Sequence, residues 1–334
     1  MALTLAINGF GRIGRNVLRA LVESGRKDIR IAAINDLGPV ETNAHLLEFD
    51  SVHGRFPGTI TVDGDTIDAG QGPVRVSAER DPEALDWSDI DVVLECTGLF
   101  TDRDAAARHL KNGARRVLVS APAKGADRTV VYGVNHDSLT AGDIVVSNGS
   151  CTTNCLAPVA KVLHEAVGIT RGFMTTVHSY TGDQPTLDRM HKDLYRARGA
   201  GLNIIPTTTG AARAVGLVLP DLAGRLDGTA IRVPTPNVSA VDLTFEAGRE
   251  TDAAEINAAI AAAAEGPLAG VLGVTGRELV SSDFNHNPLS AVFATDQTRV
   301  MDGTFCRVLA WYDNEWGFSN RMLDVAAEMG RRAG

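Results

Sequence analysis

Apolar residues in the first half of the chain form short runs that predict buried strands. Residues 3–7, 29–34, 92–94 and 117–119 are almost wholly apolar, and amphipathic stretches lie between some of them, such as residues 103–111. Strands that alternate with helices are typical of a doubly wound parallel sheet, an α/β fold. Such sheets bind ligands at the carboxyl ends of their strands.

The pattern changes after residue 150. A helical periodicity covers residues 152–167, and an alanine-rich helix is expected over residues 252–264. Alternating strand-like segments follow at residues 172–178, 240–246 and 304–312, and a last helix is expected from about residue 319 to 329. We therefore expect a second, α+β domain with a mostly antiparallel sheet and helices on one face. The proposed division is 1–150, 151–314 and 315–334.

A glycine motif follows the first strand. Gly9, Gly11 and Gly14 give the spacing G-x-G-x-x-G between a strand and a helix, and Asp36 ends the next strand about twenty residues later. Gly9 allows a tight turn, Gly11 a close approach to a pyrophosphate, and Gly14 close packing of helix on strand. Asp36 suits the 2′-hydroxyl of an adenosine ribose. These features predict a Rossmann-type domain that binds NAD.

Cys151 lies at a second junction of strand, turn and helix. An apolar run at 144–146 and the turn 147–149 precede it, and the helix follows. Backbone N–H groups and the helix dipole at such a position stabilise a thiolate, and can bind an oxyanion formed by attack on a carbonyl. The alternative is a capped helix that contains a buried structural cysteine.

A nucleophilic cysteine needs a base, and His178 ends a predicted strand just before a loop. The alternative is a structural histidine. Arg196 and Arg232, with the run 207–210, are candidate donors for phosphate groups, whereas for Arg198 a solvated surface charge is a strong alternative. Near the ends of predicted strands lie Arg80, Thr97 and Ser120, which spacing alone does not separate from ordinary loop residues.

Composition excludes several classes of function. Hydrophobic residues make up 44% of the chain, which fits a globular protein, and the net charge of -9 with no basic stripe argues against nucleic-acid binding. The four cysteines form no CxxC motif and no His/Cys cluster, so we expect no metal site and reduced thiols in the cytoplasm. No apolar run reaches membrane-spanning length, and the N-terminus lacks the pattern of a secretion signal.

Several motifs together resemble phosphorylating glyceraldehyde-3-phosphate dehydrogenase, in order and over nearly the whole chain. They are Asn-Gly-Phe-Gly-Arg-Ile-Gly-Arg at 8–15, Ser-Cys-Thr-Thr-Asn-Cys at 150–155, His-Ser-Tyr-Thr at 178–181, Pro-Thr-Thr-Thr-Gly-Ala-Ala at 206–212, Arg-Val-Pro-Thr-Pro-Asn at 232–237 and Trp-Tyr-Asp-Asn-Glu at 311–315.

The resemblance implies a role for each matching residue. Cys151 would be the nucleophile and His178 its base, while Thr181 and Arg232 would hold the phosphate of the substrate, glyceraldehyde 3-phosphate. The site for inorganic phosphate would comprise Ser150, Thr152, Arg196, Thr209 and Gly210. The cofactor would be held by Gly9, Gly11, Arg12, Ile13, Asp36, Arg80, Thr97, Ser120 and Asn314. It also implies a homotetramer and a final helix that packs on the NAD-binding domain.

The implied reaction joins these roles. A Cys151 thiolate attacks the aldehyde, hydride passes to NAD⁺ while His178 takes the hydroxyl proton, and phosphate cleaves the thioester to give 1,3-bisphosphoglycerate. Two departures from the family pattern matter: Gly182 replaces the usual Asn, and Arg189-Met190 stands where NAD-specific members often carry Leu-Pro. We still predict a preference for NAD from Asp36.

Three alternative functions are also compatible with parts of the sequence. The stretch Ser-Asp-Phe-Asn-His-Asn-Pro at 282–288 resembles erythrose-4-phosphate dehydrogenase, a sister enzyme, although the run 207–210 favours a phosphate-using enzyme. A non-catalytic dinucleotide-binding regulator would not need both Cys151 and His178. A plain cysteine hydrolase gives no role to the fingerprint at 9–36.

Overall fold

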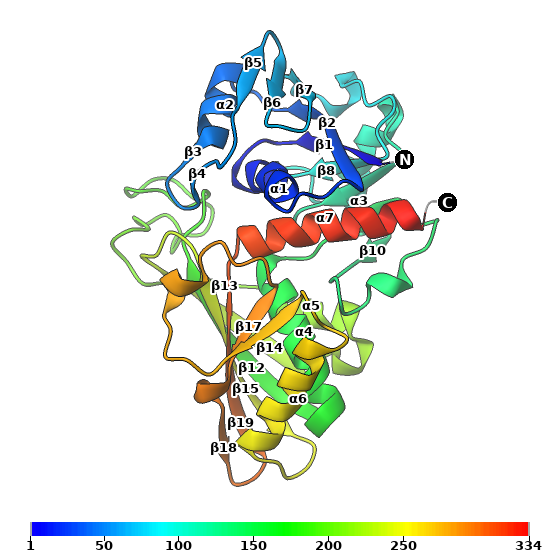
Figure 1. Ribbon diagram of the computed structural model, residues 1–334. Coiled ribbons are helices and arrows are strands. Elements are labelled where there is room, and N and C mark those ends of the chain that lie inside the picture. The colour runs from blue at the N-terminus through cyan, green and yellow to red at the C-terminus, as the bar shows by residue number, and fades with distance from the viewer. Residues whose placement is uncertain (1, 333–334) are drawn as a thin grey trace. The chain divides into compact units, whose positions relative to one another are not determined.

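A computed structural model describes the chain from residue 2 to residue 332, and its elements are labelled in Figure 1. The chain separates into two compact units. The first contains the residues up to Val130, His136–Ser150, and the chain from Ser319 onward. The second contains Val131–Asn135 and Cys151–Phe318.

The first unit is built on a nine-stranded sheet in the order β10-β11-β9-β8-β1-β2-β7-β6-β5. Its strands are β1 (Leu3–Asn8), β2 (Ile29–Asn35), β5 (Thr61–Asp63), β6 (Thr66–Asp68), β7 (Pro73–Ser77), β8 (Val92–Glu95), β9 (Arg116–Val119), β10 (Arg128–Thr129) and β11 (Val145–Ser147). A small separate ribbon pairs β3 (Phe49–Asp50) with β4 (Gly54–Arg55). The parallel doubly wound sheet is confirmed, and an antiparallel extension through β5, β6 and β7 is added at one edge.

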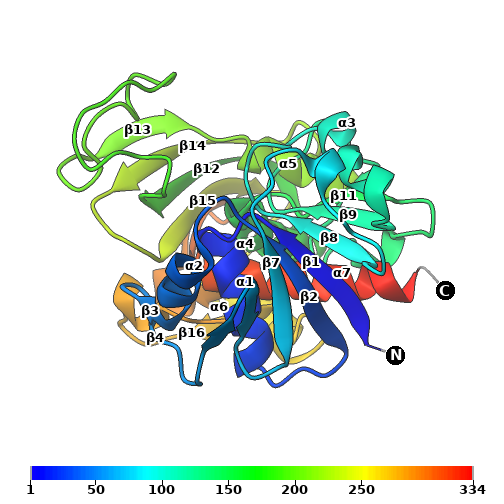
Figure 2. The same ribbon diagram turned by 90° about the horizontal axis from the view of Figure 1, so that it is seen from above.

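The strand order contains a switch point between β1 and β8. From β1 the chain moves outward to β2 and β7, and it then returns to the other side of β1 with β8, β9 and β11, an order visible in Figure 2. In doubly wound sheets the crevice at the carboxyl ends of the two strands that flank such a point binds the ligand. Here those strands end at Asn8 and Glu95.

The first unit also contains four helical segments: α1 (Arg12–Glu23), α2 (Val40–Glu48), α3 (Arg103–Ala106) and the part of α7 (Trp316–Arg331) from Ser319 onward. The helix expected over residues 103–111 is wrong in its extent: α3 ends at Ala106, and a 3₁₀ helix, Ala107–Asn112, follows. Gly113 ends the segment with φ of +106°, a left-handed conformation that favours glycine, and a Cβ there would lie 2.8 Å from the backbone nitrogen of Ser88.

The second unit contains an eight-stranded sheet in the order β13-β14-β12-β15-β19-β17-β16, with β18 paired to β19. Its strands are β12 (Ile169–Ser179), β13 (Ile205–Thr208), β14 (Leu226–Val233), β15 (Ser239–Ala247), β16 (Leu272–Thr275), β17 (Ala291–Ala294), β18 (Arg299–Met301) and β19 (Phe305–Tyr312). The mostly antiparallel sheet is confirmed. Two pairings, β12 with β14 and β16 with β17, are parallel.

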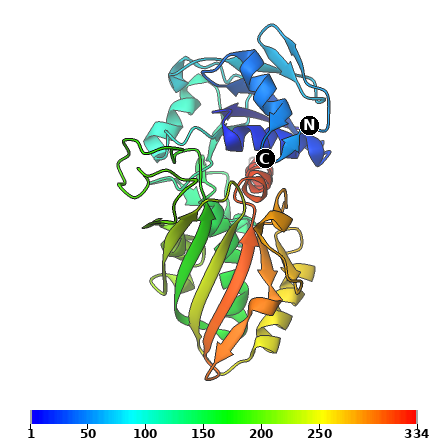
Figure 3. The same ribbon diagram turned by 90° about the vertical axis from the view of Figure 1, so that its left-hand side faces the viewer.

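Helices α4 (Cys151–Val167), α5 (Ala211–Val218) and α6 (Ala253–Glu265) cover one face of this sheet, as Figure 3 shows. Apolar residues of α4, such as Leu156 and Leu163, pack with Leu243 and Phe293 of the sheet in one continuous core. The last helix starts at Trp316, earlier than expected, because the Asp313 carboxylate accepts the N–H groups of residues 315 and 316 and so caps it.

Candidate active site

Cys151 is the first residue of α4, and its Sγ lies 3.5 Å from Nε2 of His178. His178 is the penultimate residue of β12 and is buried. The start of one helix and the end of one strand therefore bring together two residues that sequence reasoning paired only as a hypothesis. The distance is within the range for a hydrogen bond that involves sulfur, and a cysteine–histidine contact is the arrangement that activates a thiol.

The ring of His178 has a defined tautomer. Its Nδ1 lies 2.7 Å from the backbone oxygen of Ser179, which can only accept, and 3.1 Å from NH1 of Arg232. The two hydrogens of that NH1 go to the Ser179 oxygen and to Thr181, so Nδ1 carries the proton and Nε2 presents a lone pair to Cys151. Burial, together with the nearby charge of Arg232, lowers the pKa of His178 to about 3. The imidazole is therefore neutral near pH 7 and able to accept a proton.

The pKa of Cys151 shows two opposing effects. Burial raises it above the ordinary thiol value, while the charge of Arg232 and hydrogen bonds at the start of α4, from Thr152 and the Cys151 backbone, lower it. The helix start acts in the expected direction, but burial outweighs it. The resting pair near pH 7 is a thiol beside a neutral imidazole, and the thiolate forms when His178 takes the proton.

Arg232 reaches this pair through the sheet register. It lies opposite His178 in the parallel pairing of β14 with β12. Its NH1 donates to the backbone oxygen of Ser179 at 2.9 Å and to Oγ1 of Thr181 at 3.0 Å. Its Nε is buried and has no hydrogen-bond partner among residues 2–332. A partly buried guanidinium with a donor to spare is suited to binding an anion.

Arg196 lies nearby but is joined to Arg232 only indirectly. Asp183 accepts the hydroxyl of Thr181 on one oxygen and NH1 of Arg196, at 3.1 Å, on the other. Burial opposes the ionisation of Asp183, yet these contacts lower its pKa. Nε of Arg196 donates to the hydroxyl of Thr207 at 3.0 Å. Sequence reasoning missed Asp183, because nothing in its spacing distinguishes it from other loop acids.

The other residues predicted for a phosphate site are less closely grouped. Thr152 follows Cys151 in α4, and its hydroxyl is 2.8 Å from that of Tyr312. Thr209 accepts the N–H of Ala211 at 3.1 Å, and Gly210 precedes the first residue of α5. Ser150 is the last residue before Cys151 and belongs to the first unit. No hydrogen bond within residues 2–332 joins Thr209 to Arg196 or Cys151.

Asn314 is buried just after β19, where two serine hydroxyls hold its amide. Ser179 and Ser239 each donate to its Oδ1 at 2.8 Å. With the oxygen fixed as the acceptor, the amide NH₂ is left to donate elsewhere. Sequence reasoning missed both serines. Ser179 ends β12 and Ser239 begins β15. The alternation of apolar and polar residues in these strands predicts where the serines lie, but it does not indicate a function.

In the first unit the glycine motif has the geometry expected of it. Gly9 has φ of +92°, and a Cβ there would lie 2.7 Å from the backbone nitrogen of Thr97. A Cβ on Gly14 would lie 2.2 Å from the backbone oxygen of Gly9, so the glycine is required for close packing. Gly11 precedes α1, which begins at Arg12 without a side-chain cap. The N–H groups at this end of the helix suit a phosphate.

Asp36 lies directly after β2 and faces the glycine turn. Its two carboxylate oxygens accept the N–H groups of Phe10 at 2.9 Å and Gly38 at 3.0 Å. A carboxylate held in this way keeps lone pairs for the hydroxyls of a ribose. These residues therefore fit a dinucleotide, whose pyrophosphate would lie at the start of α1.

The remaining residues predicted for the cofactor surround this edge of the sheet. Arg12 forms an ion pair with Asp50, whose pKa is lowered to about 2 by that contact and by backbone hydrogen bonds, although burial opposes the change. Ile13 is the second residue of α1, and Arg80 is exposed in the bend after β7. Thr97 and Ser120 follow the carboxyl ends of β8 and β9.

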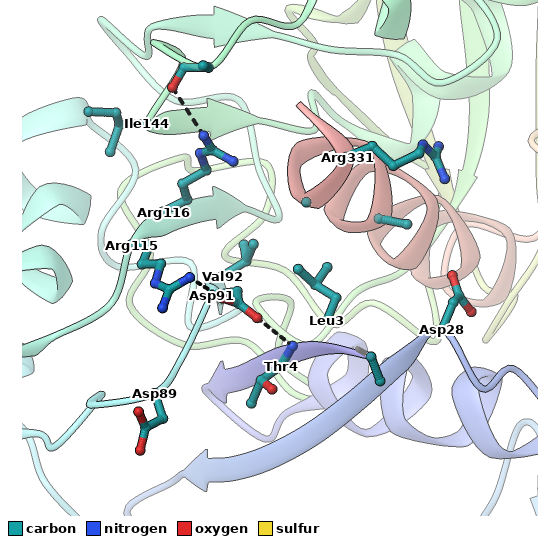
Figure 4. Close-up of a pocket in the computed structure, with 14 residues that line it drawn as sticks. Leu3, Thr4, Asp28, Asp89, Asp91, Val92, Arg115, Arg116, Ile144 and Arg331 are labelled. Atoms are coloured by element: carbon teal, nitrogen blue, oxygen red, sulfur yellow. Dashed lines mark hydrogen bonds and ion pairs between the residues drawn. The ribbon is translucent and has the colours of Figure 1, made fainter. Parts of the chain in front are cut away.

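A hollow of about 960 Å³ lies at the opposite, amino-terminal edge of the same sheet (Figure 4). Both of its neighbouring arginines already have partners: Arg115 pairs with Asp91 at 3.1 Å, and Arg116 donates to the backbone oxygen of Ala141 at 3.1 Å. It contains neither a cysteine nor a histidine. The chemistry therefore belongs to the carboxyl edge and to the Cys151–His178 pair.

Between residues 2 and 332 no group of three or more His, Cys, Asp or Glu side chains is arranged to hold a metal ion. None of the helices in that range has the length and apolar character that a membrane crossing requires.

A doubly wound sheet with a dinucleotide fingerprint and, in the second unit, a cysteine–histidine pair define the class as a dinucleotide-dependent oxidoreductase. Comparison with known proteins gives the family. Residues 3–103 match the family model of the glyceraldehyde 3-phosphate dehydrogenase NAD binding domain, and residues 150–314 match that of the C-terminal domain.

Whole-chain relatives agree with the family models. A glyceraldehyde-3-phosphate dehydrogenase of Cereibacter sphaeroides is 70% identical over 331 residues, which cover 99% of both chains. Those of Xanthobacter flavus and Geobacillus stearothermophilus are 69% and 54% identical over 333 and 330 residues, covering 99% and 98% of both chains. The chain belongs to the glyceraldehyde 3-phosphate dehydrogenase family and is an NAD-dependent oxidoreductase. The erythrose-4-phosphate alternative is not favoured.

Proposed function

We propose that this chain oxidises D-glyceraldehyde 3-phosphate to 1,3-bisphosphoglycerate with NAD⁺ and inorganic phosphate. The observation that carries the proposal is the contact of 3.5 Å between Cys151 Sγ and the unprotonated Nε2 of His178. This pair can generate a thiolate and then hold the proton. Membership of the family supports the choice of substrate.

The proposed mechanism uses the site residues in turn. His178 takes the thiol proton, Cys151 attacks the aldehyde carbon, and His178 returns the proton to the carbonyl oxygen, which gives a thiohemiacetal and a neutral imidazole. NAD⁺, held at the glycine turn and Asp36, would supply the acceptor for the hydride. His178 acts as the base for the hydroxyl proton of the thiohemiacetal, which leaves a thioester on Cys151. Phosphate then attacks the thioester carbon, and the Cys151 thiolate leaves and regains a proton from His178.

The arginines explain why phosphate, and not water, would cleave the thioester. Arg232 and Thr181 bind the phosphate of the substrate, and Arg196 with Thr209, Gly210, Ser150 and Thr152 forms the site for the attacking phosphate. The spare Nε of Arg232 and its contact with Thr181 support the first assignment. Asp183 links the two arginines, and we propose that an incoming anion displaces it from Arg196.

We propose that the cofactor is NAD in preference to NADP. Asp36 is already held by Phe10 and Gly38 beside the glycine turn, and a 2′-phosphate would meet its negative charge. The cofactor residues would be Gly9, Gly11, Arg12, Ile13, Asp36, Arg80, Thr97, Ser120 and Asn314. Values of kcat/KM for the two cofactors test the preference, and a higher value with NADP would contradict it, with Arg189 the first residue to examine.

We propose further that the domains are residues 1–150, 151–314 and 315–334, and that the enzyme is a cytoplasmic homotetramer that does not act on nucleic acid or membranes. Exposed apolar side chains in the segment 182–204 support assembly: Leu187, Met190, Leu194, Leu202 and Ile204 are each at least 72% exposed. The four cysteines are free thiols, which fits a reducing compartment.

The test is the formation of NADH from glyceraldehyde 3-phosphate and NAD⁺, with and without inorganic phosphate. We expect fast turnover that requires phosphate. Turnover that is weak and indifferent to phosphate would contradict phosphorolysis of the thioester and would point to a hydrolysing enzyme, for which erythrose 4-phosphate is the next substrate to try.

A further inference from the structure

A row of polar side chains lies along the carboxyl edge of the sheet in the first unit. Ser77, Asn35, Asn8 and Glu95 are the last residues of β7, β2, β1 and β8, which are neighbours in that order. Ser77 donates to Asn35 at 3.0 Å, Asn35 to Asn8 at 2.8 Å, and Asn8 to Glu95 at 2.6 Å. The row thus crosses the switch point between β1 and β8.

Glu95 is the end of this row and is only 1% exposed. Its Oε1 accepts both the N–H, at 2.8 Å, and the hydroxyl of Thr97. Its Oε2 accepts Nδ2 of Asn8 and faces Nε2 of His109 at 3.0 Å. None of these four donors belongs to a lysine or arginine, so the carboxylate is held by hydrogen bonds from its neighbours.

The direction of each hydrogen bond is fixed by the next one. The indole N–H of Trp87 can only donate, and it lies 3.0 Å from Nδ1 of His109, so the ring proton is on Nε2 and points at Glu95. Asn8 cannot turn its amide over, because its Oδ1 accepts from Asn35. Three of the four partners, the N–H of Thr97, Nδ2 of Asn8 and Nε2 of His109, can only donate here, so the site suits a group that accepts on both oxygens, and a carboxylate meets this requirement.

Three of the four residues in this row are followed within two positions by residues assigned to the cofactor. Gly9 follows Asn8, Asp36 follows Asn35, and Thr97 is two residues after Glu95. The fit between the two strand ends is tight, since a Cβ on Gly9 would lie 2.7 Å from the backbone nitrogen of Thr97. A shift of either strand end would change the distance between the glycine turn and Thr97.

We propose that Glu95 is a positioning residue for the NAD site. By binding Thr97 with one oxygen and Asn8 with the other, it sets the spacing between the ends of β8 and β1, and so between the two sides of the dinucleotide crevice. The inference rests on the proposed function only in that Gly9 and Thr97 hold the cofactor.

The variant Glu95→Gln is the direct test, because it keeps the shape of the side chain and turns one acceptor into a donor. Whichever way the amide is oriented, its NH₂ faces at least one N–H group that can only donate, the backbone N–H of Thr97 on one side or Nδ2 of Asn8 and Nε2 of His109 on the other. We expect the Kd for NAD⁺, measured by calorimetry on the full chain, to rise by about tenfold to a hundredfold. The rate of Cys151 alkylation by iodoacetamide without cofactor should stay within about twofold, because that residue lies in the other unit.

A second substitution should restore binding. In the double variant Asn8→Asp with Glu95→Gln, the carboxylate and the amide exchange places. The new amide at position 95 then donates to the new carboxylate at position 8. That carboxylate still accepts from Asn35, and its second oxygen takes the place of the Nδ2 atom that lies 3.5 Å from Nε2 of His109. We expect Asn8→Asp alone to weaken NAD⁺ binding, because it places a second carboxylate against that of Glu95. The double variant should recover most of the affinity.

Asp143→Asn is the matched control. Asp143 is buried, accepts Nε of Arg128 at 3.0 Å and precedes β11, at the amino-terminal edge of the same sheet. The substitution should lower the melting temperature without changing the Kd for NAD⁺. The inference would be overturned if Glu95→Gln bound NAD⁺ as the unmodified chain does, if Asp143→Asn weakened binding equally, or if the double variant stayed as weak as Glu95→Gln. Failure of the unmodified chain to bind NAD⁺ would instead contradict the proposed function, and the inference with it.

Discussion

Two buried histidines, one in each unit, show how the same side chain acquires opposite roles. The indole of Trp87 donates to Nδ1 of His109, so Nε2 of that ring donates to Glu95. The carbonyl of Ser179 accepts from Nδ1 of His178, so Nε2 of that ring accepts from Cys151. The donors and acceptors around Nδ1 decide whether the ring supports a structure or acts as a base.

The largest test of this comparison is to remove each ring. His178→Asn deletes the group that accepts the thiol proton, so we expect kcat for NADH formation to fall by about a hundredfold to ten-thousandfold. The Kd for NAD⁺ should change little. A variant that keeps its full rate would contradict the role of His178 as the base.

His109→Gln is the matched variant in the other unit. It removes part of the hydrogen bonding around Glu95, so it should lower the free energy of unfolding by roughly 1–3 kcal/mol. It should raise KM for NAD⁺ more than it lowers kcat, as followed by thermal unfolding and steady-state kinetics. A loss of kcat as large as in His178→Asn would contradict the assignment of a structural role to His109 and a catalytic role to His178.

The next largest effect concerns the anion site beside His178. Arg232→Gln removes a partly buried charge whose Nε donor is free, so we expect KM for glyceraldehyde 3-phosphate to rise by about tenfold to a hundredfold. Arg198→Gln is the control, because Arg198 is exposed and pairs with Asp188 at 2.6 Å. Steady-state kinetics should place its KM within about twofold of the unmodified value.

The protonation states predict how alkylation depends on pH. Because folding raises the pKa of Cys151, the thiol form is favoured, and the alkylation rate should still be increasing above the ordinary thiol pKa of about 8.5. His178, with a pKa of about 3, should add no transition between pH 5 and 8. Iodoacetamide kinetics over that range and above it test this, and a plateau below pH 7 would show a resting thiolate.

The smallest effect is expected from Ser239→Ala. It removes one of the two hydroxyls that fix Oδ1 of Asn314, while Ser179 keeps the other contact. We expect KM for NAD⁺ to rise by roughly fivefold, the value of one ordinary hydrogen bond. Adding Ser179→Ala should increase the loss by more than the sum of the single changes, and simple additivity would show that the serines do not act together on Asn314.

Features that depend on neighbouring residues could be predicted from the amino-acid sequence alone. Gly9 and Gly14 are required by a turn and by close packing a few residues away, and Cys151 begins a helix whose apolar face is visible in the pattern. Local spacing carries this information because strands and helices have fixed periods. For the same reason both sheets were predicted in outline.

Contacts between distant segments became visible only in the folded chain. Arg232 meets His178 because β14 pairs with β12 in parallel, and Glu95 meets Asn8 because β8 returns beside β1. Strand register is set by packing across the whole sheet, so no local pattern reveals it. Which ring nitrogen of each histidine carries the proton could likewise not be predicted from the sequence, because it depends on neighbouring donors and acceptors that the fold supplies.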